Sequence, residues 1–395
     1  MTSTAGAQQQ IDSALRRSVE AGEVPGVVAM AADERGSIYE GAFGVRDLGA
    51  GPAMTLDTVF RIASMTKAIT SVAAMQLVEE GKLGLDEPVP EIDPALNAPQ
   101  VLEGFDAAGQ PRLRPARRPV TLRHLLTHTA GFTLDWSNPN TQRYVQATGM
   151  PPMSSGKRAA LRQPIAFDSG EKWEYGINTD WIGRIIETVI GQPLGSYLRD
   201  RICAPLGMED TGFAPTPEQR ARLAPVHQRE PDGALVPTAF DLPVDPEFYG
   251  GGGSLYSTGR DYLTFLRMLL QGGTLNGARI LRPETVALIN RNQVGDLQAG
   301  RLPSQVPERA HDFELFPGMK VRWGLAYMLN LEPGPNGRSA NSLSWAGIFN
   351  SYFWLDPARR IAGVILAQFL PFADPAMLRL YAQFERGIYA MLEAR

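Results

Sequence analysis

Residues 65–78 are apolar on every side of the helix that they predict. Ala, Met, Leu, Ile and Val fill most of the positions, polar residues are few, and Gly81 follows as a stop signal. A helix of this composition has no face that prefers water. We therefore expect a buried helix around which the rest of the chain is organised.

A serine and a lysine stand at the start of this helix, three positions apart. Residues at this spacing share one helix face, so the amine of Lys67 can reach the hydroxyl of Ser64. Free backbone N–H groups and the dipole in the first turn also favour an oxygen nucleophile and the oxyanion that it forms. The alternative is that Ser64 only caps the helix, because S-x-x-K is a common tetrapeptide.

Length, charge and cysteine content narrow the class of protein. A chain of 395 residues with 44% hydrophobic content can bury about three quarters of its unfolded surface, and its length suggests about two domains. A formal charge of −4 gives no basic footprint, so we expect a small-molecule substrate and neither nucleic acid nor a membrane as partner. The single cysteine, Cys203, excludes an internal disulfide, and its apolar segment indicates a small core residue.

The N-terminal segment has neither a basic region nor an apolar region of the kind that signal peptides carry. No run approaches the roughly 18 apolar residues of a membrane helix. We therefore expect a cytoplasmic protein.

Strand patterns occur at both ends of the chain. Residues 7–22 predict a helix, and 27–32 and 37–43 predict a β-hairpin. Near the other end, a helix over 374–393 follows four predicted strands, at 323–329, 342–348, 351–355 and 361–367. Strands at both ends with helices between them predict an α+β fold, in which one antiparallel sheet is built from both termini.

The middle of the chain predicts a mainly helical insertion. Residues 82–120 are rich in Pro, Asp, Arg and Gly and show little periodicity, as expected where a chain leaves one domain for another. A more helical stretch follows to about residue 212, and residues 213–248 are proline-rich and irregular. We expect an α/β sheet domain and a helical inserted domain, formed by residues 1–86 with 250–395 and by residues 87–249.

Two later segments carry further signals. Tyr175 is predicted on a loop just before a helix that Asn178 or Thr179 caps, and such loops carry function more often than packing does. The glycines of Tyr249–Gly253 lack the Lys-Ser/Thr of a phosphate loop, so we interpret them as backbone that passes close beside the cleft. After them, Thr258-x-x-Asp261 predicts a capping box for a helix over 259–271.

Together these motifs resemble the serine β-lactamase and penicillin-binding-protein superfamily, and within it the family VIII carboxylesterases and the related statin-side-chain acyltransferase of fungi. The likeness covers nearly the whole chain. Its segments stand in the family's order: SMTK at 64–67, HLLTHTAGF at 124–132, WEYGINTDW at 173–181, ICAPLGM at 202–208, YGGGGSLYS at 249–257 and WAG at 345–347. Residues 101–114 are similar to the acyltransferase branch.

The resemblance implies a catalytic triad and an oxyanion hole. Ser64 would be the nucleophile, Lys67 its base partner and Tyr175 the third catalytic group. A free ammonium and a free phenol are both poor bases at neutral pH, so we treat Lys67 and Tyr175 as a coupled pair that shares the work of general base and acid. The backbone N–H groups of Ser64 and Ile348 would form the oxyanion hole.

The resemblance also implies that Trp345 and Gly347 bind substrate. Trp345 begins the W-A-G that stands where β-lactamases carry K-T-G, so an apolar wall replaces the cation for a β-lactam carboxylate. This change favours uncharged acyl esters, although Arg322 and Arg338 are other candidates for holding a carboxylate. The S-D-N triplet is missing, and Asn178 lies one place later than in Y-x-N, so Asn178 receives no catalytic role.

Other chemistries lack their motifs. No G-x-S-x-G occurs, so the nucleophile elbow of α/β-hydrolases is missing. His124 and His128 have i, i+4 spacing without the glutamate of H-E-x-x-H, so we interpret both as structural and expect no metal or other cofactor.

The sequence therefore predicts a serine carboxylesterase that hydrolyses short-chain acyl esters through an acyl-enzyme on Ser64. Acyl transfer to an alcohol and β-lactamase-like hydrolysis remain open as alternatives. A non-catalytic acylation sensor or scaffold is the alternative of another class. Such a protein is expected to lose Lys67 or Tyr175, and both stand here.

Overall fold

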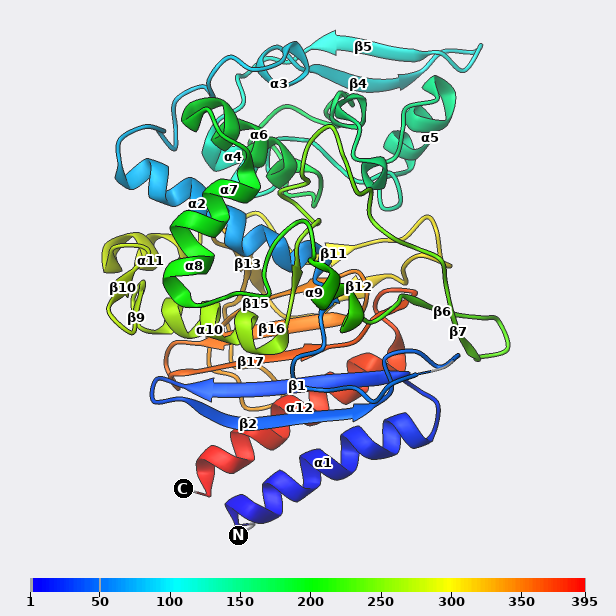
Figure 1. Ribbon diagram of the computed structural model, residues 1–395. Helices are drawn as coiled ribbons and strands as arrows, with labels where there is room; N and C mark the ends of the chain where they lie inside the picture. The colour runs from blue at the N-terminus through cyan, green and yellow to red at the C-terminus, as the bar shows by residue number, and fades with distance from the viewer. Residues whose placement is uncertain (1–2, 50, 395) are drawn as a thin grey trace.

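An antiparallel sheet built from both ends of the chain underlies the molecule (Figure 1). The computed structural model describes residues 3–49 and 51–394. Within them the sheet has seven strands in the order β13-β14-β15-β16-β17-β1-β2, and every neighbouring pair is antiparallel. The strands are Gly26–Asp33 (β1), Ser37–Gly44 (β2), Val321–Trp323 (β13), Met328–Asn330 (β14), Leu343–Gly347 (β15), Ser351–Asp356 (β16) and Ile361–Leu366 (β17). The predicted α+β fold is confirmed.

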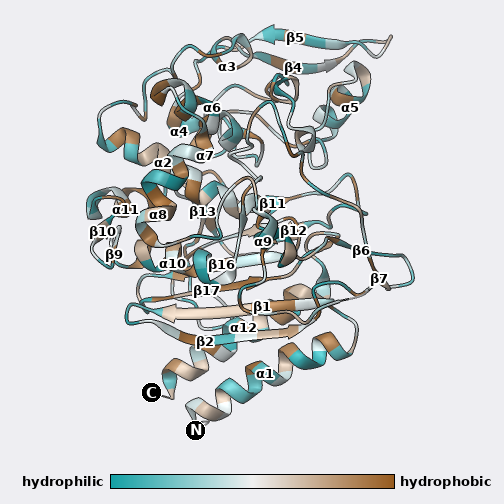
Figure 2. Ribbon diagram, viewed as in Figure 1, coloured by the Kyte–Doolittle hydropathy of each residue, from teal (hydrophilic) through white to brown (hydrophobic). Residues whose placement is uncertain are grey.

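Two terminal helices pack side by side along the sheet (Figure 1). They are α1, Thr4–Glu20, and α12, Pro375–Glu393. Hydrophilic and hydrophobic stretches alternate along α1, as in an amphipathic helix, whereas β17 is largely hydrophobic (Figure 2). A third helix, α10 (Gly259–Leu270), contacts β1 and β17 and buries eight of its residues. These helices close the core of the sheet region.

The central helix is enclosed, as predicted. It is α2, Thr66–Glu79, and every residue from Thr66 to Leu77 is buried. A 3-10 turn, η1 (Ala63–Met65), precedes it and contacts β15 and β16. On its other side α2 packs against α6 (Asn178–Ile190) and α7 (Leu194–Leu198). The start of α2 therefore lies between the sheet and the helical region.

The remaining elements are short. The helical ones are α3 (Pro94–Asn97), α4 (Leu122–Leu126), α5 (Pro139–Thr148), η2 (Met153–Ser155), η3 (Arg158–Leu161), η4 (Arg199–Cys203), α8 (Ala204–Leu206), α9 (Pro217–Ala221) and α11 (Pro283–Ile289). The paired strands are β3 (Phe60–Arg61) with β8 (Tyr256–Ser257), β4 (Gln100–Phe105) with β5 (Pro111–Pro115), β9 (Thr274–Leu275) with β10 (Ala278–Arg279), and β11 (Arg301–Leu302) with β12 (Phe313–Glu314). A three-stranded sheet joins β18 (Phe369–Leu370), β6 (His227–Arg229) and β7 (Leu235–Pro237).

Several local expectations were wrong. Hairpins β4–β5 and β6–β7 lie within the segments 82–120 and 213–248, for which no strands were expected. Their outer strands, β5 and β7, lack the alternation of buried and exposed residues that marks a half-buried strand. The strand expected over 323–329 is two strands, β13 and β14, because the N–H of Gly324 donates to the carbonyl of Tyr327 and closes a turn. The predicted domain boundaries stay a prediction.

Two predicted helix caps also differ. Ile177, and neither Asn178 nor Thr179, is the N-cap of α6. Thr258 caps α10 as expected, but Asp261 does not complete the box. Its carboxylate instead accepts the N–H of Asp210 from a neighbouring loop, so tertiary packing replaces the local cap.

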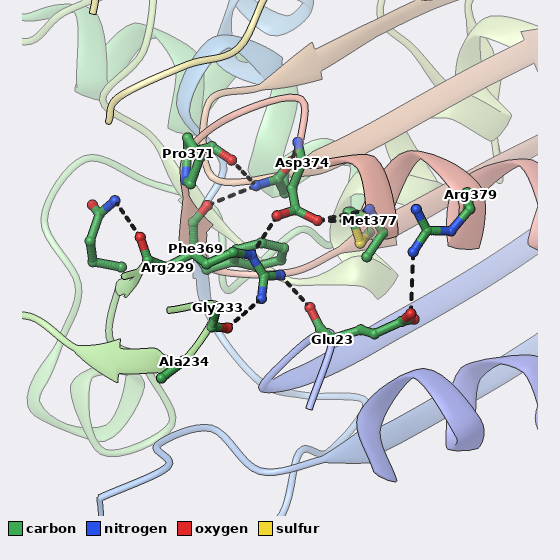
Figure 3. A network of polar contacts seen from close by, with 12 residues as sticks. Glu23, Arg229, Gly233, Ala234, Phe369, Pro371, Asp374, Met377 and Arg379 are labelled. Carbon is green, nitrogen blue, oxygen red and sulfur yellow. Dashed lines mark hydrogen bonds and ion pairs between the residues drawn. The ribbon is translucent and has the colours of Figure 1, made fainter. Parts of the chain in front are cut away.

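A polar network ties the β6–β7 hairpin to the start of α12 (Figure 3). Arg229 Nε donates to Asp374 Oδ2 at 2.6 Å, and Arg229 Nη2 donates to the Glu23 carbonyl at 2.6 Å. Asp374 also caps α12 by accepting the N–H groups of Ala376 and Met377. The hairpin, which belongs to the predicted insertion, is thereby fixed to elements from both ends of the chain.

Among residues 3–49 and 51–394, no helix is both long enough and apolar enough to cross a lipid bilayer.

We predict that Arg229→Ala lowers the free energy of unfolding by about 3 kcal/mol, because it leaves the buried Asp374 carboxylate without its cation. The matched control is Arg379→Ala, which breaks an exposed pair with Glu23 and should cost less than about 1 kcal/mol. Urea unfolding of both variants measures the difference. Equal losses of unfolding free energy in the two variants would contradict the claim that the Arg229 network stabilises the fold more than an exposed ion pair does.

Candidate active site

Ser64 is presented by a strained turn. Ala63, just before it, has a φ of +45°, which lies in the left-handed region that residues with a Cβ rarely adopt. Ala63 and Met65 are buried, whereas Ser64 is partly exposed. Met65 is the N-cap residue of α2, and no side chain caps that helix end. Ser64 therefore does not cap the helix in the way that the structural alternative required.

Lys67 is buried and points back at Ser64. Its Nζ donates to Ser64 Oγ at 3.1 Å and to the carbonyl oxygen of Gly252 at 2.6 Å. The side chain is only 5% exposed, so its ammonium has exchanged water for these protein oxygens. Nζ also lies 4.7 Å from the ring centroid of Tyr175, over its face, in a cation–π contact. The predicted Ser64–Lys67 spacing thus produces the expected hydrogen bond.

Tyr175 lies on the loop before α6, as predicted, and Trp345 holds its hydroxyl. The indole N–H of Trp345 donates to the Tyr175 oxygen at 3.0 Å, and the two ring centroids are 4.9 Å apart. Trp345 is 3% exposed and packs edge-on against Trp323. In the described chain, no hydrogen bond joins the Tyr175 hydroxyl to Lys67. The lysine therefore meets the ring face, and the tryptophan meets the phenol oxygen.

His128 packs against Tyr175. The ring centroids of His128 and Tyr175 are 4.5 Å apart, and His128 Nδ1 accepts the backbone N–H of Gly176 at 3.3 Å. The side-chain amide of Asn178 lies 2.9 Å from the same nitrogen and also donates to the Phe132 carbonyl. Burial, followed by the nearby charge of Lys67, holds the pKa of His128 well below its ordinary value. A neutral His128 thus fixes the loop that carries Tyr175.

The end of β15 lies against the nucleophile turn. A Cβ on Gly347 would lie 2.5 Å from the Ile62 carbonyl oxygen, so only glycine allows this approach. Ala63 and Ile348 belong to one apolar cluster. Within the described part of the chain, the N–H groups of Ser64 and Ile348 have no hydrogen-bond acceptor. Two backbone donors at this position suit an oxyanion, and their role stays a prediction.

A small pocket lies beside the glycine-rich segment. It has a volume of about 30 Å³ and is lined by Gly250 and Ser254, which flank Gly252, together with apolar side chains such as Leu242, Pro243 and Phe248. A larger cavity of about 780 Å³ lies between α7, α8 and the loop that follows α8, and contains none of Ser64, Lys67 or Tyr175. The small pocket is not lined by Ser64, Lys67 or Tyr175 either, so both cavities reach the glycine-rich segment and neither reaches the nucleophile.

The other residues considered from the sequence have structural partners. His124 caps α4 with Thr121, and Arg338 is buried in an ion pair with Glu385. Arg322 hydrogen-bonds Gln298 on the surface. Cys203 lines the larger cavity, and burial raises its pKa to about 12, so its thiol stays protonated at neutral pH.

This geometry can be compared with known proteins. The Beta-lactamase family model matches residues 11–387, nearly the whole chain. The chain belongs to the Beta-lactamase family. With this fold and a family model that matches nearly its whole length, the chain is a serine hydrolase or acyltransferase of that family.

Its relatives in the Beta-lactamase family include acyltransferases and an esterase. Monacolin J acid methylbutanoyltransferase of Aspergillus terreus is 33% identical over 399 aligned positions, which cover 97% of this chain and 96% of the relative. Lovastatin esterase of Penicillium rubens is 31% identical over 97% of this chain and 99% of the relative. The LovD6 mutant of simvastatin synthase from Aspergillus terreus superposes with a TM-score of 0.85 at 32% identity, covering 99% of this chain and 98% of that structure.

Sequence reasoning missed the supporting residues of this Beta-lactamase family site. It placed His128 and Asn178 outside the chemistry, although both hold the Tyr175 loop. It did not single out Asp180, which accepts the N–H of Gly252. The usable signal was that all three lie in the two segments, 124–132 and 173–181, that carry the resemblance.

The Trp345 donor predicts a pH effect. Trp345→Phe removes the hydrogen bond to the Tyr175 oxygen, and a donor at that oxygen favours the phenolate. We expect the ascending limb of kcat/KM for an aryl ester to move to higher pH, by up to about one unit. Trp323→Phe is the control, because its indole N–H donates to the Leu126 carbonyl instead. A limb that stays in place in Trp345→Phe would show that the donor has no part in proton transfer.

Proposed function

We propose that this protein is a serine carboxylesterase that hydrolyses short, uncharged acyl esters through an acyl-enzyme on Ser64. The observation that carries the proposal is the contact between Lys67 Nζ and Ser64 Oγ, with Lys67 held by Gly252 and seated over Tyr175. A hydroxyl held against a lysine–tyrosine pair, which can accept the serine proton once the pair has lost one of its own, is an arrangement that suits nucleophilic catalysis.

The reaction follows from this geometry. Ser64 Oγ attacks the ester carbonyl, and its proton passes to the Lys67–Tyr175 pair. The oxygen that becomes negative lies between the N–H groups of Ser64 and Ile348. When the tetrahedral intermediate collapses, the pair returns the proton to the departing alcohol. Water then attacks the acyl-enzyme carbonyl while the same pair takes its proton. The bond between Ser64 Oγ and the acyl carbon breaks, the proton returns to Ser64 Oγ, and the acid leaves.

The residue at position 345 supports an uncharged acyl group, whereas the expectation of a short chain rests on the resemblance. Trp345 stands where a carboxylate-binding lysine would stand, and Arg338 is committed to Glu385. A carboxylate would lose water at the site without an assured partner, at a cost of a few kcal/mol.

Acyl transfer to an alcohol is the second candidate. It is favoured by the identity to the methylbutanoyltransferase, which extends over 97% of this chain. An alcohol would take the place of water in the second step, and Ser64, Lys67 and Tyr175 would keep the same tasks. The cytoplasmic location expected from the sequence stays a prediction.

Lys67 and Tyr175 are predicted to act as one unit. Lys67→Ala and Tyr175→Phe should each lose most of the rate of aryl ester hydrolysis, and the double variant should lose little more than the worse single variant. Ser64→Ala supplies the background, since it should abolish hydrolysis and, by removing one hydrogen bond, cost about 1 kcal/mol of stability. Additive losses, or activity of Ser64→Ala within about tenfold of the wild type, would contradict the assignment.

Substrate choice is tested with p-nitrophenyl esters from acetyl to palmitoyl and with nitrocefin. We expect p-nitrophenyl butyrate to give a higher kcat/KM than nitrocefin, and Trp345→Lys to narrow that ratio. Addition of an alcohol, with ester product measured by chromatography, separates transfer from hydrolysis. If nitrocefin is the better substrate of the wild type, the protein acts as a β-lactamase and Trp345 does not set its specificity.

A further inference from the structure

Asp180 is a buried carboxylate that the mechanism above does not use. It lies in the first turn of α6 and is 6% exposed. Its Oδ1 accepts the backbone N–H of Gly252 at 3.0 Å. The carbonyl of the same glycine accepts from Lys67 Nζ at 2.6 Å. One residue of the glycine-rich segment therefore connects the carboxylate to the catalytic ammonium.

The fit around Asp180 is tight. A Cβ on Gly252 would lie 2.4 Å from Asp180 Oδ2, and a Cβ on Gly250 would lie 3.0 Å from Oδ1. The next carbonyl along the segment, that of Gly251, accepts from Thr70 Oγ1 of α2 at 2.7 Å. The segment is thus held between α2 and α6. Because its glycines have no side chains, there is room for the Asp180 carboxylate against its backbone.

The titratable groups around Lys67 determine how the Asp180–Gly252 contact affects its charge. The titratable groups that face its ammonium are Tyr175, His128 and Asp180. His128 is neutral, as described above. Burial, the largest effect, raises the pKa of Asp180 above its ordinary value, and the charge of Lys67 and the N–H of Gly252 oppose this shift. An ionised Asp180 would compensate the charge of the buried Lys67.

We propose that Asp180 is a positioning residue for Lys67, with two effects on the reaction. It fixes Gly252 so that the glycine carbonyl holds the ammonium against Ser64, and its negative charge sets the pH at which Ser64 becomes reactive. The inference rests on the proposed function, because it assigns a task within the Ser64–Lys67–Tyr175 site.

The two effects separate in two variants. Asp180→Asn keeps an oxygen for the Gly252 N–H but removes the charge, whereas Asp180→Ala removes both. Removal of a negative charge favours loss of a proton from the Lys67–Tyr175 pair, whichever member carries it. We expect the pH midpoint of Ser64 reactivity to fall by about one to two units in both variants. The limiting rate at high pH should fall more than about tenfold only in Asp180→Ala.

The readout is a single chemical event that does not need turnover. Diethyl p-nitrophenyl phosphate reacts once: the Ser64 Oγ–P bond forms, the P–O bond to nitrophenolate breaks, and the serine proton passes to the Lys67–Tyr175 pair. Nitrophenolate release against pH gives the midpoint and the limiting rate. Peptide mass spectrometry of the product locates the phosphoryl group.

Asp261→Asn is the matched control. Asp261 is also a buried carboxylate that accepts a backbone N–H, that of Asp210 at 2.9 Å, but it lies on α10 and does not contact Gly252 or Lys67. Its substitution should leave the midpoint unchanged. Circular dichroism establishes that each variant is folded, and Asp180→Ala serves for the charge effect if Asp180→Asn does not fold.

The outcomes separate the inference from the proposed function. A wild type that is labelled at Ser64, with a midpoint that does not move in Asp180→Asn or Asp180→Ala, overturns the inference and leaves the esterase proposal in place. An equal shift in Asp261→Asn overturns it as well. A wild type that is not labelled at Ser64 overturns both.

Discussion

A buried ammonium is the constraint on which this structure depends. Lys67 lies almost out of contact with water, so the free energy lost with its hydration shell has to be regained from protein oxygens. The Gly252 carbonyl and the Ser64 hydroxyl supply two of these contacts, and the face of Tyr175 supplies a third. The same contacts orient Lys67 toward Ser64. The groups that replace water around the charge are therefore also the groups that position the lysine to activate the serine.

The groups that surround the buried Lys67 side chain come from distant parts of the chain. Helix α2 carries the lysine, the loop before α6 carries Tyr175, and α6 itself carries Asp180. The glycine-rich segment passes between α2 and α6. The sheet contributes Trp345, which orients the phenol oxygen, and Gly347, which allows close approach to the nucleophile turn. The strained backbone of Ala63 persists because the packing on both sides holds it.

The sequence predicted those parts whose signals are local. The apolar run at 65–78 and the terminal strands set the sheet and the central helix, since periodicity and composition report burial directly. The hairpins β4–β5 and β6–β7 lack the alternation of apolar and polar residues that predicts a strand. The side chains of Asn178 and Asp261 do not cap helices as predicted, because they hydrogen-bond to residues elsewhere in the chain. Ser64, Lys67 and Tyr175 could be named from motifs. The Trp345–Tyr175 hydrogen bond joins residues 170 positions apart, and the sequence has no local signal for such a contact.

The proposed mechanism requires that Ser64 carries the acyl group during the reaction. The most direct measurement is rapid acid quenching of the wild type during turnover of p-nitrophenyl butyrate, followed by peptide mass spectrometry. We expect a butyryl group on the peptide that contains Ser64, and no such group in Ser64→Ala. A butyryl group on another residue, or steady hydrolysis with no acylated peptide at any quench time, would contradict it.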